Sequence, residues 1–263
     1  MAIVGSDEVF SLESGVNIMM YGHAVNTDNM ISYAPSFGQT DIERIEKMHC
    51  RNLISSGLSN FKALSVRDEN SAMLVEELTD RKPSIVCDPV LLYDFANTKV
   101  SIDLPKEKYL IVYAYDRNMT ADNEVKAIKE YAVKNNLITV SAGNYHEWCD
   151  VNIVADCLEW IELFRGAEAV ITDTYHGTIV SAITNTPMAI FVRNKINSKK
   201  LTDLINRLGL NERQLLNFTA EEINDIFNNK LDFNTLNKTI INIRNSSEQF
   251  LIDSINKCKV SKV

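Results

Sequence analysis

The segment VITDTYHGTIVSAI, residues 170–183, contains an aspartate and a histidine three positions apart, Asp173 and His176. The apolar run stops at Asp173, and a helix-like pattern restarts around His176. In an open α/β sheet, ligands bind beyond the carboxyl ends of the strands, and the start of a helix favours an anion. These residue types therefore predict a site for a phosphorylated substrate, where His176 acts as acid or base or contacts the phosphate.

A structural interpretation of the same residues stays open. Asp173 and Thr174 are good helix N-cap residues, and Gly177 can serve close packing. Asp7 follows the first apolar run in the same manner. Asp7 and Asp173 therefore either orient His176 and accept a proton from an attacking hydroxyl, or serve only turn and cap chemistry.

Arg67 is the best candidate cation, because it ends a predicted strand in the segment SVRDE. The planar fork of an arginine suits both a phosphate and a carboxylate. The alternative is an ion pair with Asp68, Glu69 or another carboxylate. Ser36, in the segment APSFG, is expected to lie in a tight loop that lines a cleft between domains.

Short β-branched runs alternate with helix-period segments, which indicates βαβ units and a largely parallel sheet. The predicted strands cover residues 2–4, 31–34, 63–66, 84–87, 109–113, 137–140, 151–154, 169–172 and 188–192. The predicted helices cover residues 41–55, 69–78, 121–134, 157–165, 176–184 and 199–208. These strands and helices would place the acidic residues and the histidine at strand ends.

The least regular connection is the segment 88–108, which carries Pro89 and Pro105. Beyond Thr219 the pattern becomes purely helical, with an apolar stripe that predicts a folded helix. We therefore expect an N-terminal domain over residues 1–104, a C-terminal domain over residues 105–218 and a helical segment over residues 219–263.

Composition and charge exclude several classes of protein. With 263 residues, 45% of them hydrophobic and 24% charged, the chain suits one large or two small globular domains. A net charge of -8 argues against a nucleic-acid partner, because such partners are bound by clustered Lys and Arg. Any anion site must therefore be local.

The cysteines and the N-terminus favour a cytoplasmic protein. The 5 cysteines are scattered and form no C-x-x-C pair, as in chains with reduced thiols. His146 and Cys149 in the segment HEWCD invite a zinc interpretation, but no second ligand pair follows, so we expect no metal. The chain has no signal-like start and no apolar run of membrane-spanning length.

Several segments together resemble the polysaccharide pyruvyl transferase family in their order and spacing. They are IVGSDEVF (residues 3–10), ISYAPSFG (31–38), LSVRDENS (64–71), CDPVLL (87–92) and ITDTYHGT (171–178). The resemblance runs from the first residues to about Lys200. It implies an α/β fold of two Rossmann-like domains of GT-B type, with mainly parallel sheets.

The resemblance also implies the reaction. A pyruvyl group would pass from phosphoenolpyruvate to the hydroxyls of a sugar or glycan-precursor acceptor, as a ketal, without a cofactor. Such an enzyme would act in the bacterial cytoplasm during surface polysaccharide biosynthesis, and peripheral proximity to the membrane stays open. The acceptor sugar and the oligomeric state stay open at this point.

The resemblance assigns residues to the phosphoenolpyruvate site. They are an arginine, a histidine and a later basic residue, which map onto Arg67, His176 and Lys195. Arg193, Lys199 and Lys200 lie close to the last position and leave that assignment open. We also expect Ser36, Gly177 and Thr178 to bind substrate.

Family members usually begin with additional strands and helices ahead of the GSD motif, so we expect an incomplete N-terminal domain. Two other functions stay open. One is a GT-B glycosyltransferase that uses a nucleotide sugar. The other is a truncated, non-catalytic member of the family.

Overall fold

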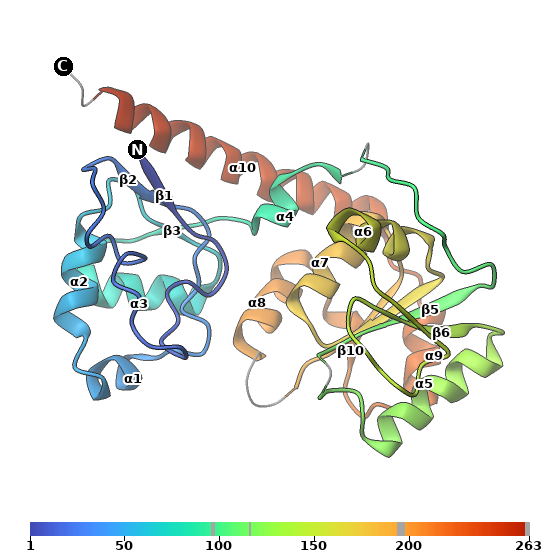
Figure 1. Ribbon diagram of the computed structural model, residues 1–263. Helices are drawn as coiled ribbons and strands as arrows, with labels where there is room; N and C mark the ends of the chain where they lie inside the picture. Colours follow the sequence, from blue (N-terminus) through green and yellow to red (C-terminus); the bar gives the residue numbers. More distant parts are fainter. Residues whose placement is uncertain (96–97, 116, 194–197, 261–263) are drawn as a thin grey trace. The chain divides into compact units, whose positions relative to one another are not determined.

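The computed structural model describes residues 1–95, 98–115, 117–193 and 198–260 of the chain. The chain forms two compact units (Figure 1). Unit 1 comprises Met1–Tyr93 and Thr239–Val263, and unit 2 comprises Asp94–Lys238. Both units are α/β structures with parallel strands, which confirms the predicted fold class.

Unit 1 contains short parallel strands linked by helices. Its strands are β1 (Ala2–Val4), β2 (Met30–Ser32), β3 (Ser65–Val66) and β4 (Ser84–Ile85). Its helices are α1 (Ile42–Lys47), α2 (Arg51–Ser59), α3 (Glu69–Thr79), α4 (Pro89–Leu92) and the later part of α10 (Phe233–Val260). β1 pairs with β2 and β3 with β4, and a bridge from Ile31 to Ala63 connects the two pairs.

Helix α10 supplies part of the apolar core of unit 1. Phe250 and Leu251 pack against Tyr33 and Val86, while Cys258 packs against Ile31. The hydroxyl of Ser247 also accepts a hydrogen bond from the Cys87 backbone at 2.9 Å. The later part of α10 therefore belongs to this unit.

Unit 2 is built on a 6-stranded parallel sheet in the order β10-β9-β8-β5-β6-β7. Its strands are β5 (Tyr109–Tyr113), β6 (Ile138–Ala142), β7 (Val151–Ile153), β8 (Ala169–Thr172), β9 (Met188–Phe191) and β10 (Gln214–Leu215). Its helices are α5 (Asp122–Lys134), α6 (Cys157–Gly166), α7 (Tyr175–Thr184), α8 (Ser198–Leu208), α9 (Ala220–Asn228) and the 3-10 turn η2 (Asn211–Arg213).

Helices cover both faces of this sheet (Figure 1). Leu110 of β5 and Ile171 of β8 belong to a cluster with Ile128 of α5 and Ile223 of α9. On the opposite face, the ring of Tyr113 lies 4.7 Å from that of Trp160 in α6. Burial on both faces explains the nearly unbroken apolar run of β5.

The single helix predicted over residues 41–55 is wrong. The segment forms α1 and α2, separated at His49, which adopts a positive φ of 53°. A left-handed residue inside a helix interrupts its backbone hydrogen bonds. Helical periodicity on either side of this residue concealed the break.

The compact units divide the chain differently from the predicted domains. The division falls between Tyr93 and Asp94, and segment 94–104 belongs to unit 2. Arg165 of α6 accounts for this, because its guanidinium donates to the carbonyls of Phe95 and Thr98 at 3.0 and 3.3 Å. The predicted helical segment is likewise shared, with α9 in unit 2 and most of α10 in unit 1.

Candidate functional site

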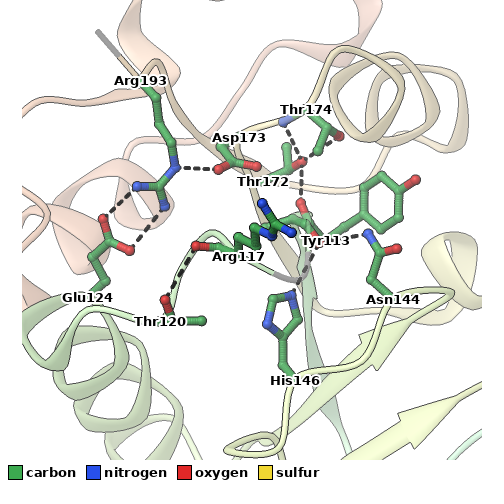
Figure 2. Close-up of polar contacts among 11 residues, drawn as sticks. Tyr113, Arg117, Thr120, Glu124, Asn144, His146, Thr172, Asp173, Thr174 and Arg193 are labelled. Atoms are coloured by element: carbon green, nitrogen blue, oxygen red, sulfur yellow. Dashed lines mark hydrogen bonds and ion pairs between the residues drawn. The ribbon is translucent and has the colours of Figure 1, made fainter. Parts of the chain in front are cut away.

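Polar side chains gather at one edge of the unit 2 sheet (Figure 2). They are Arg117 after β5, Asn144 and His146 after β6, Asp173 after β8 and Arg193 after β9. β9, β8, β5 and β6 are neighbours in that order, so their carboxyl ends meet at this edge. Ligands of open α/β sheets bind at such edges.

Arg193 bridges two buried carboxylates, as Figure 2 shows. Nη1 and Nη2 donate to the two carboxylate oxygens of Glu124 at 2.9 and 3.0 Å, and Nε donates to Oδ2 of Asp173 at 2.5 Å. The side chains of Glu124 and Asp173 are 9% and 0% exposed, whereas that of Arg193 is 29% exposed. The cation is therefore the member of this group that reaches solvent.

The Asp173 carboxyl has an altered affinity for protons. Burial raises its pKa above the ordinary value, and the Arg193 guanidinium opposes that shift. Asn118 lies close enough to favour the charged form, yet Oδ1 receives no hydrogen bond of normal geometry from the described residues. A raised pKa with spare acceptor capacity is typical of a group that exchanges protons in a site.

Helix α7 begins directly after Asp173. Thr174 is its N-cap, and the Thr174 hydroxyl accepts a hydrogen bond from the Gly177 backbone at 2.9 Å. Thr172 donates to the Tyr113 carbonyl at 2.7 Å and joins this turn to β5. His176 lies in the first turn of α7, half-buried, with its ring edge-on to that of Tyr175.

Gly177 and Thr178 hold this turn in place. A Cβ atom at Gly177 would lie 2.3 Å from Oγ1 of Thr172, so no larger residue fits. Thr178 is buried, and its hydroxyl donates to the Thr174 carbonyl at 2.9 Å. The structure thus places both residues beside His176, and their predicted contact with substrate stays a prediction.

The loops after β5 and β6 are fastened together by side chains. Nδ2 of Asn144 donates to the Ala114 carbonyl at 2.6 Å, and Nε2 of His146 lies 3.2 Å from the same oxygen. Nε1 of Trp148 donates to the Met119 carbonyl at 2.9 Å. These bonds fix the loop that carries Arg117, whose side chain lies near the centre of Figure 2.

The zinc interpretation of the HEWCD segment finds no support in this geometry. His146 faces a backbone carbonyl, and burial raises the pKa of the Cys149 thiol to about 12. Within the described part of the chain, no group of 3 or more His, Cys, Asp or Glu side chains is arranged to hold a metal ion.

Arg67 occupies the matching position in unit 1, at the end of β3. Its side chain is 1% exposed. Nη1 donates to Oδ2 of Asp88 at 2.8 Å, and Nη2 donates to Oδ1 of Asp7 at 2.6 Å. The Arg67 backbone N–H donates to the Pro35 carbonyl at 3.3 Å. Arg67 thereby connects the carboxyl ends of β1, β2, β3 and β4.

The loop that carries Asp7 is held by Ser36. Asp7 adopts a positive φ of 58° and pairs with Pro35 through a parallel bridge. The Ser36 backbone N–H donates to the Asp7 carbonyl at 2.7 Å, and the Ser36 hydroxyl accepts from the Gly38 backbone at 2.9 Å. Ser36 is fully buried, so the geometry gives it a part in shaping this loop. Its contact with substrate stays a prediction.

The structure brings the expected site residues together in two groups. Asp7, Arg67 and Ser36 lie in unit 1, and the residues around His176 lie in unit 2. Lys195 lies outside the described residues. Sequence reasoning missed Glu124 and Asp88 as partners of the arginines. An acidic residue before Pro89, at a strand end, was the available signal for Asp88.

Residues 1–195 match the protein family described as polysaccharide pyruvyl transferase. A comparison with curated protein sequences returns no match.

Solved structures with a similar fold include a glycotransferase of kitacinnamycin, at 9% identity with a TM-score of 0.52, covering 87% of this chain and 69% of that chain. A trehalose-phosphate synthase (UDP-forming) from Burkholderia vietnamiensis matches at 6% identity with a TM-score of 0.54, covering 89% and 67%. A UDP-GlcNAc 2-epimerase from Neisseria meningitidis, bound to UDP-GlcNAc, matches at 12% identity with a TM-score of 0.52, covering 87% and 70%. The fold is therefore of the GT-B type. At these identities the likeness concerns the fold alone.

None of the described helices is both long and apolar enough to cross a membrane.

Proposed function

Because this chain belongs to the polysaccharide pyruvyl transferase family, we propose that it transfers a pyruvyl group from phosphoenolpyruvate to two hydroxyls of a sugar acceptor. The product is a cyclic ketal. A sugar or glycan precursor of a surface polysaccharide is the proposed acceptor, and the cytoplasm the proposed place of the reaction. The GT-B fold is compatible with this activity and leaves the chemistry to the side chains.

The observation that carries the proposal is which charged side chain reaches solvent at the strand ends of unit 2. Glu124 and Asp173 are buried, while the Arg193 guanidinium between them reaches solvent. Asp173 adjoins the start of helix α7, where the backbone N–H groups and the helix dipole favour an anion. An anionic donor such as phosphoenolpyruvate suits this combination, because it carries a phosphate and a carboxylate close together.

The reaction requires proton transfers at defined atoms. The terminal CH₂ of the donor takes up a proton and becomes a methyl group, and the oxygen of one acceptor hydroxyl bonds to C2. The C2–O bond to phosphate then breaks, and a second hydroxyl oxygen closes the ketal. Of the two hydroxyl protons, one is balanced by the new methyl C–H bond and the other leaves with phosphate. A positioned acid or base accelerates such steps.

We assign the unit 2 residues as follows. His176 exchanges a proton with the donor or contacts its phosphate, and Asp173 is the second candidate for proton exchange because burial raises its pKa. Arg193 stabilises the charge of the departing phosphate. The family resemblance also implies that Lys195 and Arg67 bind phosphoenolpyruvate.

Calorimetric titration of phosphoenolpyruvate into the purified protein tests the proposal without knowledge of the acceptor. We expect saturable binding by the wild type. His176→Asn should weaken it by about tenfold or more, equivalent to about 1.4 kcal/mol. The matched control is His49→Asn, since His49 is exposed, lies in unit 1 and has a positive φ that Asn tolerates.

Each other outcome contradicts the proposal in its own way. Binding of UDP-glucose by a wild type that ignores phosphoenolpyruvate would replace pyruvyl transfer with glycosyl transfer. Binding of neither ligand by the folded wild type would favour a non-catalytic member of the family. Equal weakening in His176→Asn and His49→Asn would remove His176 from the donor site.

A further inference from the structure

Glu124 lies in the first turn of α5, and its side chain reaches across unit 2 to Arg193. The helix begins at Asp122, so Glu124 is its third residue, where a glutamate often accepts a hydrogen bond from the backbone N–H of the N-cap. Here both carboxylate oxygens of Glu124 accept from the Arg193 guanidinium, at 2.9 and 3.0 Å. The carboxylate therefore holds a partner 69 positions away in the sequence.

The Arg193 guanidinium is held on several sides. Glu124 binds its two Nη atoms, and Asp173 binds Nε. The centroid of the Phe191 ring lies 4.9 Å from Cζ of Arg193, so one face of the guanidinium lies against an aromatic ring. That ring packs edge-on against Phe218, with 4.8 Å between the centroids. These contacts fix the cation before a ligand arrives.

The guanidinium keeps donors for a ligand. An arginine carries five N–H groups. Within the described part of the chain, Glu124 and Asp173 accept hydrogen bonds from three of them. The Arg193 side chain is 29% exposed, whereas the two carboxylates are buried. A ligand at this edge can therefore use the remaining N–H groups without displacing either carboxylate.

The net charge of this cluster does not by itself attract an anion, because two carboxylates accompany one guanidinium. Coulomb energy falls with distance, so the group nearest the ligand has the largest effect. Burial keeps Glu124 and Asp173 farther from an arriving ligand than the exposed part of Arg193. Anion binding thus depends on the position in which the guanidinium is held.

We propose that Glu124 is a positioning residue that holds the Arg193 guanidinium where it binds the anionic donor. This inference rests on the proposed function for the identity of that donor. Glu124 acts through Arg193, because both of its carboxylate oxygens are engaged there. A long side chain loses rotamer freedom when it binds a ligand, and an arginine that is already held loses less.

Glu124→Asp tests the inference at constant charge. Aspartate keeps the carboxylate, but its shorter side chain withdraws that group from the two Nη atoms. We expect the affinity for phosphoenolpyruvate, measured by calorimetric titration, to fall by about fivefold, because the arginine must then be ordered on binding. The matched control is Glu130→Asp, an exposed acid on the same helix, which should leave the affinity within about twofold.

Proton–nitrogen NMR of the arginine side chains separates positioning from a merely structural role. In the ligand-free wild type we expect separate signals for the two Nη groups of Arg193, because Glu124 binds both and slows their rotation. Arg193→Lys identifies these signals by removing them. They should merge in Glu124→Asp and stay separate in Glu130→Asp. Separate signals in Glu124→Asp would show that Glu124 does not hold the guanidinium, and would overturn the inference.

Glu124→Gln is the second variant if Glu124→Asp does not fold. Glutamine keeps the length of the side chain and one acceptor oxygen, and it leaves Arg193 paired with Asp173. Positioning predicts weaker phosphoenolpyruvate binding, although the cluster has lost a negative charge. A rise in affinity would show that Glu124 acts on the donor through its charge alone, and would overturn the inference.

The failure of this inference and that of the proposed function differ in their signatures. The same titrations with inorganic phosphate make the distinction. Phosphate binding that weakens in Glu124→Asp, by a protein whose wild type ignores phosphoenolpyruvate, would contradict pyruvyl transfer and leave the positioning role standing. Equal phosphoenolpyruvate affinity in the wild type and in Glu124→Asp would overturn the positioning role alone.

Discussion

Unit 1 and unit 2 each place one arginine between two carboxylates at the carboxyl ends of parallel strands. In unit 1 the arginine is buried, and Asp7 remains 65% exposed. In unit 2 both carboxylates are buried, and Arg193 is the exposed member at 29%. Each cluster consists of two carboxylates and one guanidinium. The exposed member is a carboxylate in unit 1 and the guanidinium in unit 2.

The difference shows that burial, more than composition, decides what such a cluster can bind. An arginine that two buried carboxylates hold in place still has N–H groups on its outer edge, where an anion can dock. The proposed assignment of an anionic donor to unit 2 follows from the exposure of Arg193.

The largest expected effect comes from removing the buried carboxylate of unit 1. Asp88→Asn removes the buried carboxylate that pairs with Arg67 at 2.8 Å, so a buried charge loses an ion pair. We expect the free energy of unfolding to fall by about 3–5 kcal/mol. Asp7→Asn should cost about 1 kcal/mol or less, because its side chain is mostly exposed. Urea unfolding followed by circular dichroism measures both.

The informative quantity is the difference between the losses in free energy of unfolding in Asp88→Asn and Asp7→Asn. Equal losses would mean that Asp7 is as important to folding as Asp88, and that its exposure does not reflect a binding role. A larger loss for Asp7→Asn would contradict the comparison outright.

Much of the fold could be predicted from the sequence, because the central strands are buried on both faces. The apolar runs at Tyr109–Tyr113 and Ala169–Thr172 carry a strong signal, and the predicted strands match the observed β5 and β8. β10, with 2 residues, was missed. Its pairing with β9 depends on a partner distant in sequence, which local periodicity does not reveal.

The candidate site was less predictable, because its charges are paired across long sequence distances. Arg193 and Glu124 lie 69 positions apart, and Arg67 and Asp7 lie 60 apart. Residue type and strand-end position made Asp7, Arg67 and Asp173 candidates, since these features are local. Which partner is buried depends on the packing of several strands and helices, so the sequence left open the role of each arginine.

A second prediction concerns the pH dependence of stability in unit 2. Arg193→Met leaves Glu124 and Asp173 buried without their cation, so the pKa of Asp173, already raised by burial, should rise further. A carboxyl whose pKa is higher in the folded than in the unfolded protein lowers stability as pH rises through the folded pKa. We expect a loss of about 2–3 kcal/mol near pH 8 and a smaller loss near pH 5.

Urea midpoints at the two pH values measure this effect. The matched control is Arg51→Met, because Arg51 pairs with Glu46 and Glu77 at the surface. That control should lose less than about 1 kcal/mol at either pH. A loss in Arg193→Met that does not depend on pH would mean that its carboxylates stay ionised without the guanidinium, and that the cation is not needed to balance their charge.

The smallest expected effects come from the hydroxyls that shape the two strand-end turns. Ser36→Ala removes the acceptor of the buried Gly38 backbone N–H, and Thr174→Ala removes the acceptor of the Gly177 N–H at the start of α7. Each should cost about 1 kcal/mol in urea unfolding, so stability alone does not distinguish the two units. Ligand binding does: Thr174→Ala should weaken phosphoenolpyruvate binding through His176 more than Ser36→Ala does. If Ser36→Ala and Thr174→Ala instead left phosphoenolpyruvate binding unchanged, the two turns would serve folding alone, and the exposure of Arg193 beside the Thr174 turn would have no counterpart in donor recognition.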